Sequence, residues 1–148
     1  MTTPIRRAKE SDLPAILDLE RAAFQDYRQA SEASLRRSIA SPRQSFWVIP
    51  GPKRLDGILV LWHFRDTVRV YDIATHPEAR GQGVGRRLMA HAEKLAKQQG
   101  ARTMSLEAEE QDPRLVGWYE GMGFVRVARL KDFYHEGCSA LRLRKTLA

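Results

Sequence analysis

The sequence of 148 residues has a single cysteine, Cys138, which excludes a disulfide framework and a multi-cysteine zinc site. Its four histidines lie far apart, without the spacing of metal ligands, and we expect no metal. The longest apolar run, residues 58–62, is far short of the ~20 residues of a membrane-spanning helix. The first residues also lack the apolar segment of a signal peptide. These absences predict a soluble, cytoplasmic protein with no membrane partner.

Repeats, low-complexity stretches and linkers are also absent, and the length predicts one domain spanning residues 1–148. The net charge of +7 suggests an anionic ligand or nucleic acid. A nucleic-acid-binding module is the alternative from a different class, and it requires clustered basic residues interleaved with aromatics. The basic excess is instead spread over both halves of the chain, so we expect no nucleic-acid partner. The sequence leaves a monomer and a homodimer equally open.

Apolar periodicity and helix-boundary residues predict helices that alternate with strands. Helices are expected near residues 11–24, 31–40, 84–99 and 113–120. Strands are expected at residues 5–8, 46–49, 58–64, 68–73, 103–107, 124–130 and 140–143. This order indicates an α/β (α+β) fold, in which a mixed sheet carries helices on both faces.

The sharpest local feature is a glycine-rich stretch, Arg-Gly-Gln-Gly-Val-Gly-Arg at residues 80–86, between a strand and the longest predicted helix. Glycines let the backbone turn tightly and approach a ligand, and the helix N-terminus offers free N–H groups to an anion. A Walker loop would need Lys-Ser or Lys-Thr after the last glycine, and the dinucleotide fingerprint has a different spacing. The stretch therefore predicts a pyrophosphate site, with a turn that binds no ligand as the alternative.

Four ordered segments resemble the GNAT superfamily of N-acetyltransferases. Arg80, Gly83 and Gly85 fill its R/Q-x-x-G-x-G/A pattern, and residues 118–124, Trp-Tyr-Glu-Gly-Met-Gly-Phe, are similar to its L-Y-x-x-x-G-F box. Leu106-Glu107 and residues 133–141 are similar to segments of the RimI-type members, which acetylate ribosomal-protein and peptide α-amines. The resemblance implies a central twisted sheet of six to seven strands flanked by about four helices. It also implies direct transfer of acetyl from acetyl-CoA to a primary amine.

The resemblance assigns acetyl-CoA as co-substrate and names the residues that would bind it. The backbone of one strand end and the glycine-rich stretch would contact it, through Ile73, Ala74, Thr75, Arg80, Gly81, Gln82, Gly83, Val84, Gly85 and Arg86. Asp112 stands where the subgroup has an asparagine that contacts the cofactor. A carboxylate cannot donate a hydrogen bond and is unfavourable near phosphates, and capping the helix that begins at Pro113 is its alternative role.

The same resemblance implies two catalytic residues. Glu107 matches the general base, and we expect burial or the charges of Glu109 and Glu110 to raise the pKa of its carboxyl toward neutrality. Tyr119 matches the general acid, and a hydrogen bond to the departing thiolate is the more secure role. The alternatives are a solvated acid at a strand end for Glu107 and a core aromatic for Tyr119.

The acceptor is expected beside an acidic run that holds four acids within six residues, Glu107, Glu109, Glu110 and Asp112. Glu109 replaces the arginine of the RimI-type pattern, which favours a basic acceptor, and a solvated acidic turn is the alternative. Tyr27 and Tyr134 are candidate acceptor-groove residues. At pH 7 an α-amine is about one-tenth neutral, whereas lysine is neutral about once in 2,500. We therefore expect the acetyl acceptor to be the N-terminal α-amine of a protein or peptide. One alternative acceptor is a polyamine or other small cationic amine, and the alternative function is that of an inactive CoA-binding domain.

Overall fold

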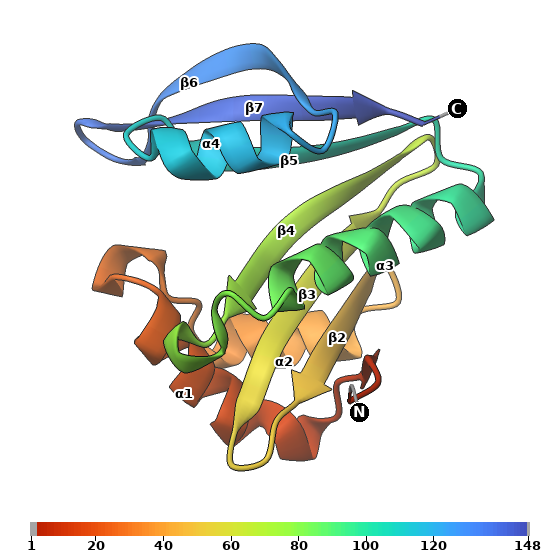
Figure 1. The fold of residues 1–148 in the computed structure, drawn as a ribbon, viewed down its shortest axis with the longest axis vertical. Helices are drawn as coiled ribbons and strands as arrows, with labels where there is room; N and C mark the ends of the chain where they lie inside the picture. The colour runs from red at the N-terminus through yellow and green to blue at the C-terminus, as the bar shows by residue number, and fades with distance from the viewer. Residues whose placement is uncertain (1–2, 148) are drawn as a thin grey trace.

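The computed structural model describes residues 3–147, which form one seven-stranded sheet in the order β1-β2-β3-β4-β5-β7-β6 (Figure 1). The strands are β1 (Arg6–Arg7), β2 (Gln44–Pro50), β3 (Leu55–His63), β4 (Thr67–Thr75), β5 (Thr103–Glu109), β6 (Val125–His135) and β7 (Cys138–Thr146). The helices are α1 (Leu13–Ala23), α2 (Glu32–Ala40), α3 (Val84–Gln99) and α4 (Pro113–Glu120). Short 3-10 turns are η1 (Glu10–Asp12), η2 (Asp26–Arg28) and η3 (Pro77–Ala79).

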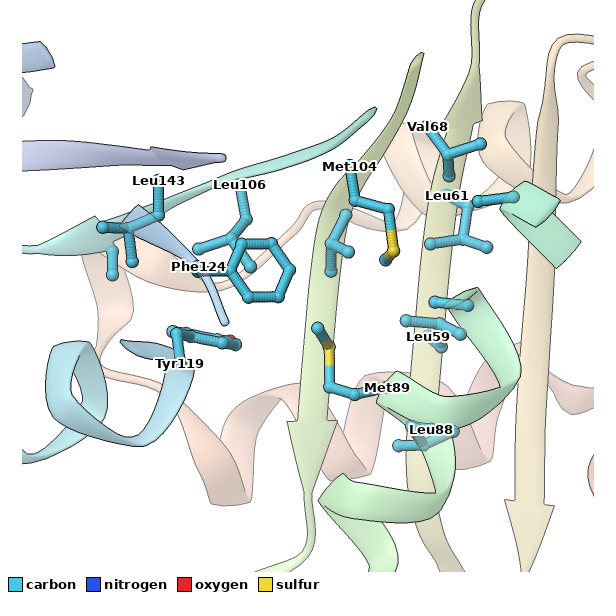
Figure 2. Close-up of a cluster of buried hydrophobic side chains, with 14 of the residues drawn as sticks. Leu59, Leu61, Val68, Leu88, Met89, Met104, Leu106, Tyr119, Phe124 and Leu143 are labelled. Atoms are coloured by element: carbon cyan, nitrogen blue, oxygen red, sulfur yellow. The ribbon is translucent and has the colours of Figure 1, made fainter. Parts of the chain in front are cut away.

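The predicted mixed sheet with helices on both faces is confirmed, and each face has its own core. One core joins α1 and α2 to β2 and β3, with Ile16, Leu35 and Ile58 almost fully buried. The other joins α3 and α4 to the sheet, and Figure 2 shows its side chains meeting between the helices and the strands. Burial on both faces explains why β2 and β3 contain continuous apolar runs, whereas β5 alternates between buried and half-buried residues.

Helix boundaries follow the signals in the sequence closely. Ser31 caps α2 by accepting a hydrogen bond from the Ser34 N–H, and Asp112 caps α4 in the same way before Pro113. Gly100 ends α3 in the left-handed conformation, at φ +82°. Each of these signals depends on neighbours within a few residues.

Strand boundaries are less well predicted at both ends of the chain. The first strand is only Arg6–Arg7, while β6 and β7 extend well beyond the predicted 124–130 and 140–143. β6 is an edge strand that is exposed along most of its length, so its extent depends on pairing with β7 and not on a buried apolar pattern.

The sheet opens between its two parallel strands. β4 pairs with β5 only from Thr67↔Thr103 to Arg69↔Ser105, although β4 continues to Thr75 and β5 to Glu109. Figure 1 shows the two strands side by side at one end and separating toward the other. Beyond Arg69 the edge of β4 that faces β5 has no ladder partner in β5, which leaves backbone N–H and C=O groups available to a ligand.

No helix in the described part of the chain is long and apolar enough to cross a membrane.

Candidate active site

The glycine-rich stretch connects the end of β4, through η3, to α3. Gly81 and Gly83 adopt left-handed φ values of +80° and +79°, which an L-residue adopts only at a cost. Among the described residues no side chain caps the N-terminus of α3, which leaves the first-turn N–H groups of this 16-residue helix without a side-chain acceptor there. A Cβ built on Gly83 meets no atom of residues 3–147 within 4 Å. The site thus joins uncapped donors to open space, and it fits an anion such as a pyrophosphate.

Gly85 has a different role from the other two glycines. A Cβ at this position would lie 3.1 Å from Cη2 of Trp118, so the glycine allows α3 to pack closely against α4. Arg80 and Arg86 are exposed beside the loop, whereas the Arg87 guanidinium donates to the carbonyl of Thr3. The predicted loop residues are therefore adjacent in space, and the exposed Arg80 and Arg86 place positive charge next to the helix N-terminus.

Glu107 lies in β5 where the strands separate, and its side chain is only 5% exposed. Its Oε1 accepts hydrogen bonds from Arg69 of β4, with Nη2 at 2.5 Å, and its Oε2 accepts one from Nε of Arg142 of β7 at 3.0 Å. The burial expected for Glu107 is present, but its hydrogen-bond partners are arginines and not the neighbouring acids. The reason is register: Arg142 pairs directly with Glu107, and Arg69 is the last residue of β4 that pairs with β5.

Three side chains lie close to one carboxylate oxygen of Glu109. Tyr27 donates its hydroxyl to Oε1 at 2.6 Å, Nη1 of Arg28 lies 3.3 Å away, and Sγ of Cys138 lies 3.7 Å away. Burial alone would raise the pKa of Glu109, but the hydrogen bond from Tyr27 and the charge of Arg28 lower it overall. The same hydrogen bond raises the pKa of Tyr27 to about 12.

The third acceptor candidate, Tyr134, lies in the same place. Its ring is 4.4 Å from the guanidinium carbon of Arg28, and the ring of Tyr27 contacts His135 edge-on. A bulge in β6 at Asp132, which has a positive φ of 53°, offsets this part of the strand from its pairing with β7. The structure thus brings together Tyr27, Glu109 and Tyr134, all around an arginine that sequence reasoning missed.

The acidic run is not a free negative patch. Arg129 makes a bidentate pair with Glu110, with Nε–Oε2 at 2.5 Å, and Asp112 accepts from the Leu115 N–H at 3.2 Å. Together with the partners of Glu107 and Glu109, every acid of the run has a donor, and three of the four have arginines. The chain itself supplies cations to this run, and its preference for a basic acceptor stays a prediction.

Tyr119 is 4% exposed and belongs to the core on the α3–α4 face. Its ring lies 5.1 Å from that of Trp118 and 5.9 Å from that of Phe124, and Figure 2 shows it extending from α4 toward Met89. Burial raises the pKa of its hydroxyl, so the phenol stays protonated and can donate a hydrogen bond. Tyr119 thus has the core-packing role expected as its alternative, and this role is compatible with its hydroxyl donating a hydrogen bond.

A fully buried acid, Glu20, and a half-buried acid, Asp72, were also missed. Glu20 of α1 is 1% exposed; its Oε1 accepts from the Ala30 N–H at 2.7 Å, and its Oε2 has no hydrogen-bond partner within residues 3–147. Its carboxyl interacts with that of Asp72 on β4, and burial together with this like-charged neighbour raises the pKa of Asp72 well above its usual range. A β-bulge at Tyr71 lies next to Asp72 in the pairing of β3 with β4. Burial raises the pKa of Glu20 as well, so both carboxyls of this pair hold a proton more readily than exposed carboxyls do.

Residues 13–124 match the Acetyltransferase (GNAT) family. The chain belongs to the GNAT acetyltransferase family. Among its relatives is a candidate ribosomal protein bS18-alanine N-acetyltransferase of Bacillus subtilis, 25% identical over 88% of this chain and 85% of that one.

Solved structures share the fold of this GNAT chain. The ribosomal-protein-S18-alanine N-acetyltransferase of Escherichia coli aligns over 98% of this chain and 94% of its own, with 20% identity and a TM-score of 0.88. A NatC complex bound to Gag peptide and CoA aligns over the full length of both chains, with 20% identity and a TM-score of 0.81. Within residues 3–147 no group of three or more His, Cys, Asp or Glu side chains is placed to hold a metal ion.

Proposed function

We propose that this enzyme transfers an acetyl group from acetyl-CoA to the N-terminal α-amine of a protein or peptide. The observation that carries the proposal is the opening between β4 and β5. An anion-binding helix N-terminus follows β4 at one end of the opening, and a buried carboxylate, Glu107, lies in its wall.

The residues of this opening fit acetyl-CoA. The unpaired edge of β4 at Ile73, Ala74 and Thr75 offers backbone groups to the pantetheine amides, and residues 81–86 offer uncapped N–H groups to the phosphates. Exposed Arg80 and Arg86 add positive charge. Contact of the cofactor with Asp112 stays a prediction, because one carboxylate oxygen of Asp112 already caps α4.

Acetyl-CoA supplies the acyl group and a thiolate leaving group. Glu107 is proposed to take the proton of the attacking amine, directly or through one water. A carboxylate offers about four acceptor positions, and three N–H groups of Arg69 and Arg142 already use three of them. The arginines therefore orient Glu107 and leave one position for the amine proton. Tyr119, protonated and buried, would stabilise the departing thiolate by donating a hydrogen bond.

The acceptor class follows from charge and from amine chemistry. The acidic run is neutralised by arginines, so the site does not attract several positive charges at once. An α-amine releases its proton far more readily than a lysine or polyamine ammonium does, which suits a carboxylate base. Relatives named for acetylating the alanine of ribosomal protein S18 support the same class.

An acceptor panel tests this function. Thiol release from acetyl-CoA is measured with a lysine-free peptide that begins with alanine, with the same peptide blocked at its N-terminus, and with spermidine. We expect release with the free peptide and none with the blocked one. Faster release with spermidine than with the free peptide would overturn the acceptor class. Binding of acetyl-CoA without release to any amine would instead favour an inactive CoA-binding domain.

A further inference from the structure

The guanidinium of Arg28 occupies a complete cation-binding site made by the chain itself. η2 lies in the connection between α1 and α2, and it contacts β6 beside the open end of the β4–β5 separation (Figure 1). Arg28 lies 3.3 Å from Glu109, 4.4 Å from the Tyr134 ring and 5.3 Å from the Phe24 ring. A carboxylate combined with aromatic faces is the arrangement that recognises organic cations.

Other carboxyls also face the positive charge of Arg28. Besides Glu109, the acids Glu20 and Asp72 both interact with it. Removing the guanidinium would leave Glu109 without its cationic partner, beside the face of Tyr134.

We propose that Arg28 is a specificity-determining residue: it takes the position of a second acceptor cation, so the site admits an acceptor with one ammonium group and excludes diamines and polyamines. This inference rests on the proposed function, since it concerns the acceptor side of the same opening. It predicts that removing the guanidinium creates a subsite for a second ammonium, bounded by Glu109 and the face of Tyr134.

Three variants separate this role from a structural one. Arg28→Gln removes the charge, while Arg28→Lys keeps a cation in the same place, so that the preference between acceptors is expected to be kept even if overall turnover changes. Arg129→Gln is the matched control, because it removes the arginine partner of another acid in the same run, Glu110, at an exposed position. A simple loosening of η2 would lower turnover of every acceptor together and leave their ratio unchanged.

The test is the ratio of kcat/KM for spermidine to kcat/KM for the alanine-starting peptide. We expect this ratio to rise at least roughly tenfold in Arg28→Gln, because an unbalanced carboxylate attracts a second cation, and to stay within about threefold in the other two variants. An unchanged ratio in Arg28→Gln, or an equal rise in Arg129→Gln, would overturn the inference.

Equilibrium binding gives a readout that does not need turnover. Spermidine is titrated into the CoA-bound protein, and we expect it to bind at least roughly tenfold more tightly to Arg28→Gln than to the unsubstituted chain. Equal affinities would refute the role of Arg28. If no amine were acetylated but the affinities differed as expected, the proposed function would fail while the inference about the cation site would stand.

Discussion

Replacing Gly83 by alanine separates the cost of a left-handed backbone from the loss of a ligand site. Gly83 and Gly100 bracket α3 with nearly identical φ values, +79° and +82°, and a Cβ on either meets no atom of the described chain within 4 Å. Both substitutions therefore carry the same conformational cost, about 1 kcal/mol. For a domain of this size we expect each to lower Tm by roughly 2–4 °C.

The two variants should differ in acetyl-CoA binding. The added methyl of Gly83→Ala lies beside the uncapped N–H groups of α3, where we place the phosphates, whereas Gly100 is at the opposite end of the helix. We expect at least a tenfold weaker Kd for Gly83→Ala, about 1.4 kcal/mol, and no change for Gly100→Ala.

Thermal unfolding with and without acetyl-CoA, together with calorimetric titration, measures both effects. At a ligand concentration 100 times the Kd of the unsubstituted chain, binding adds about 2.7 kcal/mol of stability, and a tenfold weaker Kd reduces this to about 1.4 kcal/mol. The stabilisation should therefore fall by about half in Gly83→Ala and remain complete in Gly100→Ala. Equal affinities in the two variants would refute the placement of the phosphates at α3.

Two further substitutions test the carboxyl groups. Glu107→Gln leaves the guanidiniums of Arg69 and Arg142 with a neutral partner. Because both arginines are partly exposed, we expect the free energy of unfolding, measured with denaturant, to fall by about 1–3 kcal/mol. Turnover should fall strongly, while the affinity for acetyl-CoA stays nearly unchanged. An unaltered pH–rate profile in this variant would remove Glu107 from the mechanism. Asp72→Asn removes a carboxyl whose pKa is raised by burial and by Glu20, so that the folded state holds its proton above the pH at which the unfolded chain releases it. The free energy of unfolding of the unsubstituted protein should therefore fall, relative to Asp72→Asn, as pH rises from about 4 toward 8. A difference that is constant over unfolding curves at pH 4.5, 6 and 8 would contradict the buried pair.

Features that depend on near neighbours in the chain could be predicted from the sequence. The glycine-rich stretch, the Asp112-Pro113 helix start and the order of helices and strands each depend on local spacing, and the structure has them as expected. Tyr27, Glu109 and Tyr134 were predicted only as separate candidates for the acceptor side, and it is the fold that brings them together around Arg28.

The partners of the acids could not be predicted, because they depend on strand register. Arg69 and Arg142 are 38 and 35 residues from Glu107 in sequence, and only the pairing of β5 with β4 and β7 places them against its carboxylate. Two signals for the buried pair were nevertheless present. Glu20 falls within the apolar stripe of α1, and Asp72 interrupts an apolar strand. A charged residue at a core position is unusual enough to mark a site in advance.

The most direct test of the central claim is acetylation of one peptide that carries both kinds of amine. A peptide that begins with alanine and contains one internal lysine is incubated with the enzyme and acetyl-CoA, and fragment mass spectrometry locates the added acetyl group. The geometry and the amine chemistry predict acetylation of the α-amine, with the lysine left free. Acetylation of the lysine before the α-amine would contradict the account.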